Sequence, residues 1–263
     1  MARISWDGIG QRFFETGVDR GVLFVEGEKA VPWNGLISVD EGSDGGEPKP
    51  YYVDGVKYLN LASVEEFTAK LSAFYSPPEF DQCDGMPELA TGLSVGQQKR
   101  KPFGLSYRTM IGNDIEGSDH GYKIHLIYNA LASPSDRAHK TINDSGEAGE
   151  LSWDLTTTPT LFKTDVFSAH LVLDSTKLNP GVIAEVEDIL YGTPTSPARM
   201  PTGQELISLI ENFVNIVVED LGNGIFTVSG PDGNVRMLTS DIFEIDSSSV
   251  TMIDTNTYTI ESS

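Results

Sequence analysis

The stretch "FGLSYRTMIGNDIEGSDHGYKIHLIYNA", residues 103–130, holds two long runs in which apolar and polar residues alternate. Alternation with period two is typical of β-strands that turn one face to a core and the other elsewhere. A loop with three acids and three glycines joins the runs, as expected for the turn of an antiparallel ribbon. The sequence therefore predicts a long amphipathic β-hairpin.

The alternation also assigns the residues of this ribbon to two faces. The packed side would hold the apolar set Phe103, Leu105, Tyr107, Ile111, Tyr122, Ile124, Leu126 and Tyr128. The opposite side would hold the polar set Ser106, Arg108, Lys123, His125 and Asn129. Ile127 breaks the polar face.

Further β-prone runs flank the ribbon. Residues 20–27 and 31–40 read as strands, followed by an acidic, glycine-rich loop at 41–50. Asp54 and Gly55 between two short runs indicate a type I′ hairpin, because both turn residues must tolerate positive φ. Strands are also expected in 151–160 and 168–174.

Three helices are predicted. Ser63 and Glu66 match a capping box, with Val64, Phe67 and Leu71 at helical spacing. Residues 179–192 carry a proline at the start and a glycine past the end. Thr202 and Glu205 open a short helix after the proline-rich passage 193–201.

The fold class predicted is α+β, mostly β: an antiparallel β-sandwich or barrel with an extended amphipathic β-hairpin and two to three short helices. The last fifty residues add short β-runs separated by the turns "GNG", "PDGN" and "DTN". We expect a core domain at 1–200, and a short helix plus a C-terminal all-β appendage at 201–263.

Composition limits the function. Acids outnumber bases 39 to 18 in 263 residues, giving a formal net charge of −21, which opposes adhesion to nucleic acid or anionic lipid. Such a surface suits a protein past which DNA must slide without being held. Cys83 is the only cysteine, which excludes an intrachain disulfide and a thiolate metal cluster.

No motif carries convincing enzyme chemistry. "GLSVG" at 92–96 fits the nucleophile elbow in letters, but Ser94 is flanked by loops rather than by a strand and a helix. The acids of 114–119 and of 40–47 lack the spacing of a calcium loop. His120, His125, His139 and His170 lack paired metal-ligand spacing, so only the fold could assemble a zinc site. We expect no catalytic residue, metal or cofactor.

The ordered segments at 31–85, 96–114 and 117–144, followed by "SWDLTTTP" at 152–159, together resemble the major tail tube protein of long-tailed (siphovirus-like) bacteriophages. The resemblance spans residues 17–210 and includes "DSTKLNPGVIAEVEDILYG". The segments "DGNVRMLTSDIFEI" and "DTNTYTI" resemble a C-terminal region found on some members of that group.

The resemblance implies a structural protein that self-assembles into stacked hexameric rings, each subunit giving amphipathic strands to a continuous inner β-barrel through which the genome passes. Its partners would be other copies of itself, the tail tip, tape measure and terminator proteins, and double-stranded DNA that passes without specific binding. No membrane partner is expected. It would lie in the virion tail after assembly in the host cytoplasm.

Under this reading the polar face of the ribbon would look into the lumen. The candidate lumen residues are Ser106, Arg108, Lys123, His125 and Asn129, with Asp40 and Asp54 adding negative charge. The acidic segment 77–99 and the basic "KRK" after it would contact the next ring. These stacking candidates are Glu79, Asp81, Asp84, Glu88, Lys99, Arg100 and Lys101.

Three other classes stay open. A capsid or head-associated protein would share the composition but form shells. A soluble carbohydrate-binding β-sandwich would be a monomer with Trp6, Trp33 or Trp153 exposed in a concave site, although core packing is the expected fate of Trp33 and Trp153. An esterase would use Ser94.

Overall fold

A computed structural model describes residues 6–133, 141, 148–212 and the strands within 217–262. The protein is α+β and mostly β, with antiparallel pairing throughout the described strands, as predicted. The chain forms two compact units, Met1–Ile207 and Ser208–Ser263. None of the described helices has the length and apolarity needed to cross a membrane.

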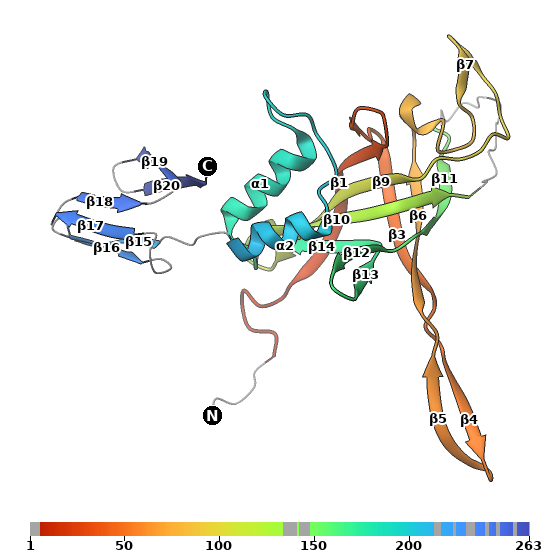
Figure 1. Cartoon of the computed structure of the whole chain (residues 1–263), viewed down its shortest axis with the longest axis horizontal. Coiled ribbons are helices and arrows are strands. Elements are labelled where there is room, and N and C mark those ends of the chain that lie inside the picture. Colours follow the sequence, from red (N-terminus) through yellow and green to blue (C-terminus); the bar gives the residue numbers. More distant parts are fainter. Residues whose placement is uncertain are drawn as a thin grey trace. The chain divides into compact units, whose positions relative to one another are not determined.

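The first unit is built on one eight-stranded sheet (Figure 1). The strand order is β2-β1-β9-β10-β11-β6-β3, and β14 pairs with β10. The strands are β1 (Phe14–Val25), β2 (Val31–Pro32), β3 (Leu36–Gly45), β6 (Glu65–Ala73), β9 (Phe103–Asn113), β10 (Gly117–Ala132), β11 (Leu151–Thr157) and β14 (His170–Asp174).

The sheet folds over on itself and encloses its core. One cluster of buried residues takes Leu23 from β1, Leu105 from β9, Leu71 from β6 and Trp153 from β11. Strands from both ends of the sheet order therefore face each other across one interior. The burial of these large side chains, at about 1.5–3 kcal/mol each, is the main favourable contribution to folding.

Aromatic rings fill the end of this interior near a short 3₁₀ helix, Pro78–Phe80. Trp33 lies 4.7 Å from Phe80 and 5.8 Å from Trp153 between ring centroids. Trp33 and Trp153 are 3% and 1% exposed, which confirms the expected core packing. Trp33 Nε1 donates to the carbonyl of Tyr75 at 2.9 Å, so its polar group is satisfied despite burial.

The predicted central ribbon is present as β9 and β10, but its faces differ from the prediction. Cα register pairs Leu105 with Ile127 and Tyr107 with His125, whereas Ser106 and Arg108 pair with Leu126 and Ile124. Directly paired residues share a face, so the apolar residues of the two strands point to opposite sides. The face with Leu105, Tyr107, His125 and Ile127 looks into the interior of the folded sheet. The face with Ser106, Arg108, Ile124 and Leu126 lies under the helices, so the ribbon is buried on both faces.

The helices cover that second face (Figure 1). The predicted helices at 180–191 and after Thr202 are confirmed as α1 (Pro180–Tyr191) and α2 (Gly203–Asn212). Asn179 caps α1 by accepting from the amide of Gly181 at 2.8 Å, and Gly192 follows the last turn at φ 79°. Thr202 and Glu205 form the predicted reciprocal capping box, at 3.2 and 3.3 Å.

The helix predicted over 63–74 is wrong, because Glu65–Ala73 forms strand β6. Phe67 and Leu71 are four residues apart, a spacing that suits a helix face and a strand face equally. Ala69 and Ala73 complete the inward strand face. They are weakly hydrophobic, so the period of two did not stand out.

The loop predicted over 41–50 is also wrong. Strand β3 continues to Gly45 and pairs with β6. Beyond it, β4 (Pro48–Val53) pairs with β5 (Val56–Ala62) in a hairpin that continues the β3–β6 ribbon. The hairpin turn at Asp54 and Gly55 is confirmed, with φ of 51° and 78°. Gly45 lies where the β3–β6 ribbon meets the β4–β5 hairpin, at φ 81°. A glycine is required there, because a Cβ would lie 2.5 Å from the Val64 carbonyl oxygen.

The remaining elements are short. Two small hairpins in the first unit are β7 (Glu88–Ala90) with β8 (Leu93–Ser94) and β12 (Thr160–Lys163) with β13 (Val166–Ser168). The C-terminal strands form three antiparallel pairs: β15 (Val217–Gly222) with β16 (Ile225–Ser229), β17 (Val235–Thr239) with β18 (Ile242–Ile245), and β19 (Ser248–Asp254) with β20 (Thr257–Ser262). The turns predicted between them fall largely outside the described residues.

Candidate assembly surface

The outward side of β3, β6 and β11 carries a regular ladder of small polar residues. Register places them in rows across the three strands: Ser38–Ser72–Ser152, Asp40–Lys70–Asp154 and Gly42–Thr68–Thr156, with Asp44 opposite Glu66. We call these eleven residues the outer polar face. Neither α1 nor α2 covers it, since both helices lie on the other side, over β9, β10 and β14 (Figure 1).

The outer polar face is negative. Lys70 lies between Asp40 and Asp154, and Asp44 and Glu66 add two unbalanced acids. Nearly all its members are exposed or half-buried, Ser72 being the buried exception at 4%. Because hydroxyl and carboxylate side chains predominate on this face, the surface is hydrated and repels phosphate.

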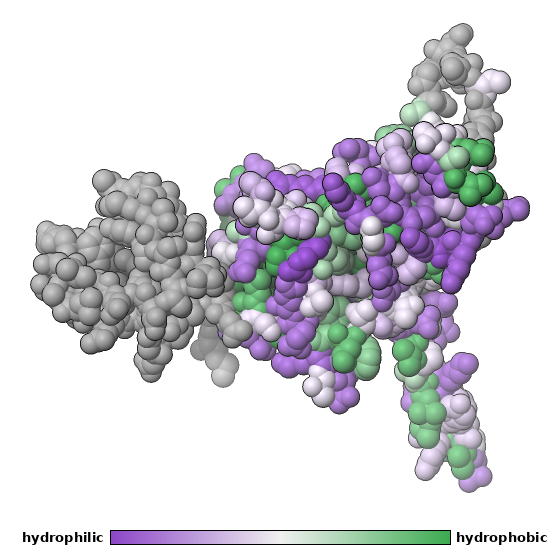
Figure 2. Space-filling model, turned by 45° about the horizontal axis from the view of Figure 1, so that its top comes forward, coloured by the Kyte–Doolittle hydropathy of each residue, from purple (hydrophilic) through white to green (hydrophobic). Residues whose placement is uncertain are grey.

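The β4–β5 hairpin continues strands β3 and β6 away from the core and carries large apolar residues (Figure 1). The β4–β5 hairpin is about 25 Å long at the usual rise of a strand. Its large apolar residues are exposed: Tyr51 51%, Tyr52 63%, Val53 53%, Val56 69%, Tyr58 72%, Leu59 36% and Leu61 57%. Figure 2 shows hydrophobic residues along this projecting arm. A lone two-stranded hairpin is marginally stable in water, so we expect this hairpin to be stabilised by contact with another chain.

An open sheet edge borders the outer polar face. Strand β3 is the last of the sheet order, and no described strand pairs with its far side. An edge strand of ten residues is long enough to pair with another chain. The edge, the polar face and the exposed hairpin therefore belong to one continuous ribbon.

Several predicted lumen residues lie elsewhere. Ser106 and His125 are 1% and 6% exposed, so they lie inside the subunit and are withdrawn as lumen candidates. Arg108 is half-buried and holds Asp19 through two hydrogen bonds of 2.8 and 2.6 Å, which lower the pKa of that carboxyl. Its guanidinium also lies over the Tyr122 ring, at 4.6 Å from the centroid. Arg108 thus fastens β9 to β1.

The other lumen candidates differ among themselves. Asp40 lies on the outer polar face, and Asp54 is at the tip of the β4–β5 hairpin. Lys123 forms an ion pair with Glu15 of β1. Asn129 is exposed at a β-bulge of β10, with φ 47°. Only Asp40 is a member of the outer polar face.

Ser106 offers a stability test. Within the described residues its hydroxyl is buried with no hydrogen-bond partner. An unpaired buried hydroxyl costs about 1–3 kcal/mol, so Ser106→Ala should raise the free energy of unfolding by about 1 kcal/mol and the melting temperature by about 2–4 °C. Half-buried Ser152→Ala is the control and should leave both unchanged. A lower melting temperature for Ser106→Ala would mean that the hydroxyl has a partner.

The predicted stacking segment is only partly exposed. Phe80, Cys83 and Asp84 are buried, so this part of the segment expected to contact the next ring packs inside its own subunit. Asp84 pairs with Arg100 at 3.5 Å, and Arg100 also donates to the Ala132 carbonyl at 2.8 Å. Asp84 and Arg100 therefore hold the segment against its own subunit.

The remaining stacking candidates lie nearer the surface. Glu79 and Asp81 are half-buried, and Lys99 and Lys101 are exposed. Glu88 accepts from the amide of Gly92 within the β7–β8 hairpin at 2.5 Å.

The enzyme-like motif has no elbow geometry. Ser94 ends a two-residue strand of the β7–β8 hairpin, and Gly92 makes its turn at φ 79°. The acidic turn after β9 uses Asp114 to accept from the amides of Gly10 and Arg12. Gly92 and Asp114 therefore have structural roles in these two turns. His139 lies outside the described residues.

A polar cluster lies in the folded sheet's interior and brings together Glu41, Tyr107 and His125. Tyr107 donates to Glu41 Oε1 at 2.5 Å, and its ring stacks on His125 with centroids 4.7 Å apart. Burial raises the pKa of Tyr107 and, against the attraction of Glu41, lowers the pKa of both His125 and His170. The phenol therefore stays protonated and the imidazoles favour the neutral form.

Neither a protein-family model nor a curated protein matches the chain. Among solved structures, a chain of the six-fold symmetrised anti-feeding prophage baseplate is similar at 11% identity and TM-score 0.34, over 65% of this chain and 97% of that one. A chain of the anti-feeding prophage cap gives 9%, 0.34, 66% and 96%. A chain of the extended sheath–tube complex of an extracellular contractile injection system gives 12%, 0.30, 59% and 88%.

Proposed function

We propose that this protein is a structural tail subunit that self-assembles into stacked rings, forming the tube through which a phage genome passes. One observation carries the proposal: a single ribbon presents an open edge on β3, a small polar outer face, and a hairpin with exposed apolar residues. A monomer gains nothing from these features, because an exposed edge and an exposed apolar arm both favour aggregation. A second copy of the chain gives each a role.

The open edge supports a barrel shared between subunits. Pairing of β3 with a neighbouring copy would extend the sheet from subunit to subunit, and closing the ring would remove the edges. The sheet's interior face is filled by its own core and the β9–β10 side by helices, so the outer polar face is the one free to line a lumen. Hexameric symmetry is what the sequence resemblance implies.

Charge supports passage of DNA rather than binding. The acids of the outer polar face, with Asp54 at the tip of the hairpin, would repel phosphate along the lumen. The exposed hairpin would pack its apolar residues against the next copy, contributing up to about 1.5–3 kcal/mol for each fully buried side chain. The protein would lie in the virion tail, after assembly in the host cytoplasm, beside tip, tape measure and terminator proteins.

Negative-stain electron microscopy of the purified protein over a concentration series tests the proposal. We expect rings or hollow tubes that become longer and more frequent as concentration rises. Closed shells would indicate a capsid or head-associated protein instead. Single compact particles at every concentration, with the chain also absent from any virion tail, would refute self-assembly.

The carbohydrate-binding alternative loses its main support. It requires aromatic side chains exposed in a concave site, whereas Trp33 and Trp153 lie in the core. Trp6 is 77% exposed in the N-terminal segment before β1.

A further inference from the structure

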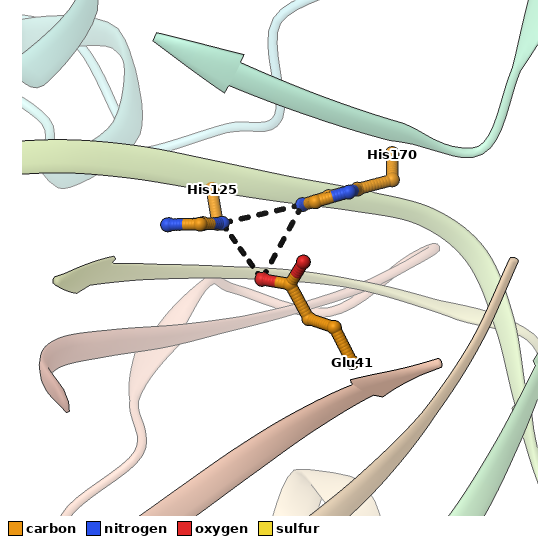
Figure 3. Close-up of side chains that lie close together, drawn as sticks. All are labelled: Glu41, His125 and His170. Carbon is orange, nitrogen blue, oxygen red and sulfur yellow. Dashed lines mark hydrogen bonds and ion pairs between the residues drawn. The ribbon is translucent and has the colours of Figure 1, made fainter. Parts of the chain in front are cut away.

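Three potential metal ligands converge in the interior of the first unit. Glu41 comes from β3, His125 from β10 and His170 from β14, and their side chains point toward one another (Figure 3). His125 Nδ1 lies 2.9 Å from Glu41 Oε1 and 3.3 Å from His170 Nε2, which is itself 3.8 Å from Glu41 Oε1. Three lone pairs at these distances repel one another unless a proton or a cation lies between them.

From this geometry we infer that Glu41, His125 and His170 form a binding site for a divalent transition-metal ion, with zinc as the best fit. Bonds of about 2.0–2.1 Å in a tetrahedral site place two ligand atoms about 3.3 Å apart. The two imidazole nitrogens already have this separation. Glu41 Oε1 needs to move only a few tenths of an ångström toward His170. Two imidazoles and one carboxylate suit zinc and its neighbours better than magnesium or calcium.

The groups around the cluster hold the ligands in orientation. His125 Nε2 lies 3.0 Å from Thr109 Oγ1, so an N–H there can donate to the hydroxyl and leave the Nδ1 lone pair for the ion. His170 stacks on Phe67 with ring centroids 4.4 Å apart. Tyr107 donates to Glu41 and fixes the carboxylate. Such outer partners are typical of a formed metal site.

Access and coordination number are consistent with one open position. The side chains of His125 and His170 are 8% and 14% exposed, whereas that of Glu41 is 36% exposed and gives solvent a path to the cluster. Three protein ligands leave a fourth position for water. An ion there would tie β3, the strand of the open edge, to β10 and β14 across the interior. The inference rests on this geometry and is independent of tube formation.

The test is zinc binding by tag-free protein after chelator treatment. We expect one zinc ion per chain by calorimetry and a melting temperature raised by about 5 °C when zinc is about 100-fold above the dissociation constant. Magnesium at the same concentration should have no effect. Cobalt(II) should give the intense visible absorption of a four-coordinate site. Absence of a zinc-dependent shift would overturn the inference.

Isosteric variants locate the site. Glu41→Gln keeps the shape and an acceptor for Tyr107 but removes the charge, so zinc affinity should fall at least tenfold. Glu116→Gln is the matched control, because Glu116 pairs with His120 in an exposed turn at 2.5 Å, and it should bind zinc like the wild type. If the metal-free Glu41→Gln protein melts well below the wild type, His170→Gln replaces it, and the same fall in zinc affinity is expected. Unchanged affinity in these site variants would refute the site.

Discussion

Replacing residues 48–62 with a two-residue Asn-Gly turn should leave the protein a folded monomer that forms no tubes. The β4–β5 hairpin contributes no residue to the buried core, and all of its residues are exposed. Asn-Gly is the preferred two-residue connection of an antiparallel pair, so Glu47 and Ser63 can be joined without strain. The melting temperature should therefore change by no more than about 2 °C, within the range of surface changes.

The loss of assembly follows from what the hairpin offers a neighbour. Its seven large apolar residues are between 36% and 72% exposed, and fully burying even three of them against the next copy would contribute about 4.5–9 kcal/mol per contact. Negative-stain electron microscopy and sedimentation at matched concentrations measure the effect. A milder version, Tyr51→Ser with Leu61→Ser, acts on one face of the hairpin and should raise the concentration needed for assembly at least tenfold.

A matched control tests whether the effect is specific to this arm. Leu161 and Phe167 are 58% and 65% exposed on the β12–β13 hairpin, so Leu161→Ser with Phe167→Ser removes similar apolar area elsewhere. We expect this control to assemble like the wild type. Normal tubes from the truncated chain would show that the hairpin is not an interface. Equal loss in the control would show that general surface hydrophobicity drives association.

The assembly surface could not be read from the sequence because its decisive residues have weak signals. Ser38, Asp40, Gly42 and Asp44 alternate with inward Val39, Glu41 and Ser43 in β3, but acids and glycines are rare in strands. From Glu41 onward β3 was therefore predicted as a loop, whereas Ser38 and Asp40 fell in the strand predicted at 31–40. Capping residues next to β6 favoured a helix, although its strand face is set by tertiary packing.

The central ribbon shows the opposite case. Two strands of strong alternation at 103–130 were predicted correctly, yet their faces were not. A strand with apolar residues on both faces can have either set opposite its partner, and only register decides. Here shifts between Gly117 and Gly121, and between Ile127 and Ala130, set that register. Local propensity specified the strands, and long-range pairing specified which side each residue lies on.

Histidines 125 and 170 illustrate the same limit. They are forty-five residues apart in the sequence, and Glu41 lies in the segment read as a loop, so no spacing rule connects the three. The pairing of β14 with β10 brings both imidazoles to one side, because Ile127 pairs with His170 and His125 lies two residues away on the same face. The Thr202–Glu205 capping box and the Asp-Gly turn, by contrast, depend on neighbours in sequence and were predicted correctly.

Reversing the charge of the outer polar face should turn tubes that do not bind DNA into tubes that retain it. Asp44 and Glu66 are directly opposite each other and both exposed, so Asp44→Lys with Glu66→Lys exchanges a negative pair for a positive one. The cross-strand repulsion stays similar, and the subunit should fold and assemble normally. Each ring would then present lysines to the phosphate backbone, and counterion release would favour binding.

The measurement is co-sedimentation of linear duplex DNA with assembled tubes, followed by nuclease treatment. We expect variant tubes to retain at least tenfold more nuclease-protected DNA than wild-type tubes at low salt, with the excess lost as salt rises. Glu185→Lys with Asp188→Lys makes the same charge change on exposed positions of α1, the helix side of the sheet. That control should bind DNA without protecting it, since a helix on the outside leaves DNA open to nuclease. Equal protection in both variants, or none in either, would mean that the outer polar face does not line the lumen.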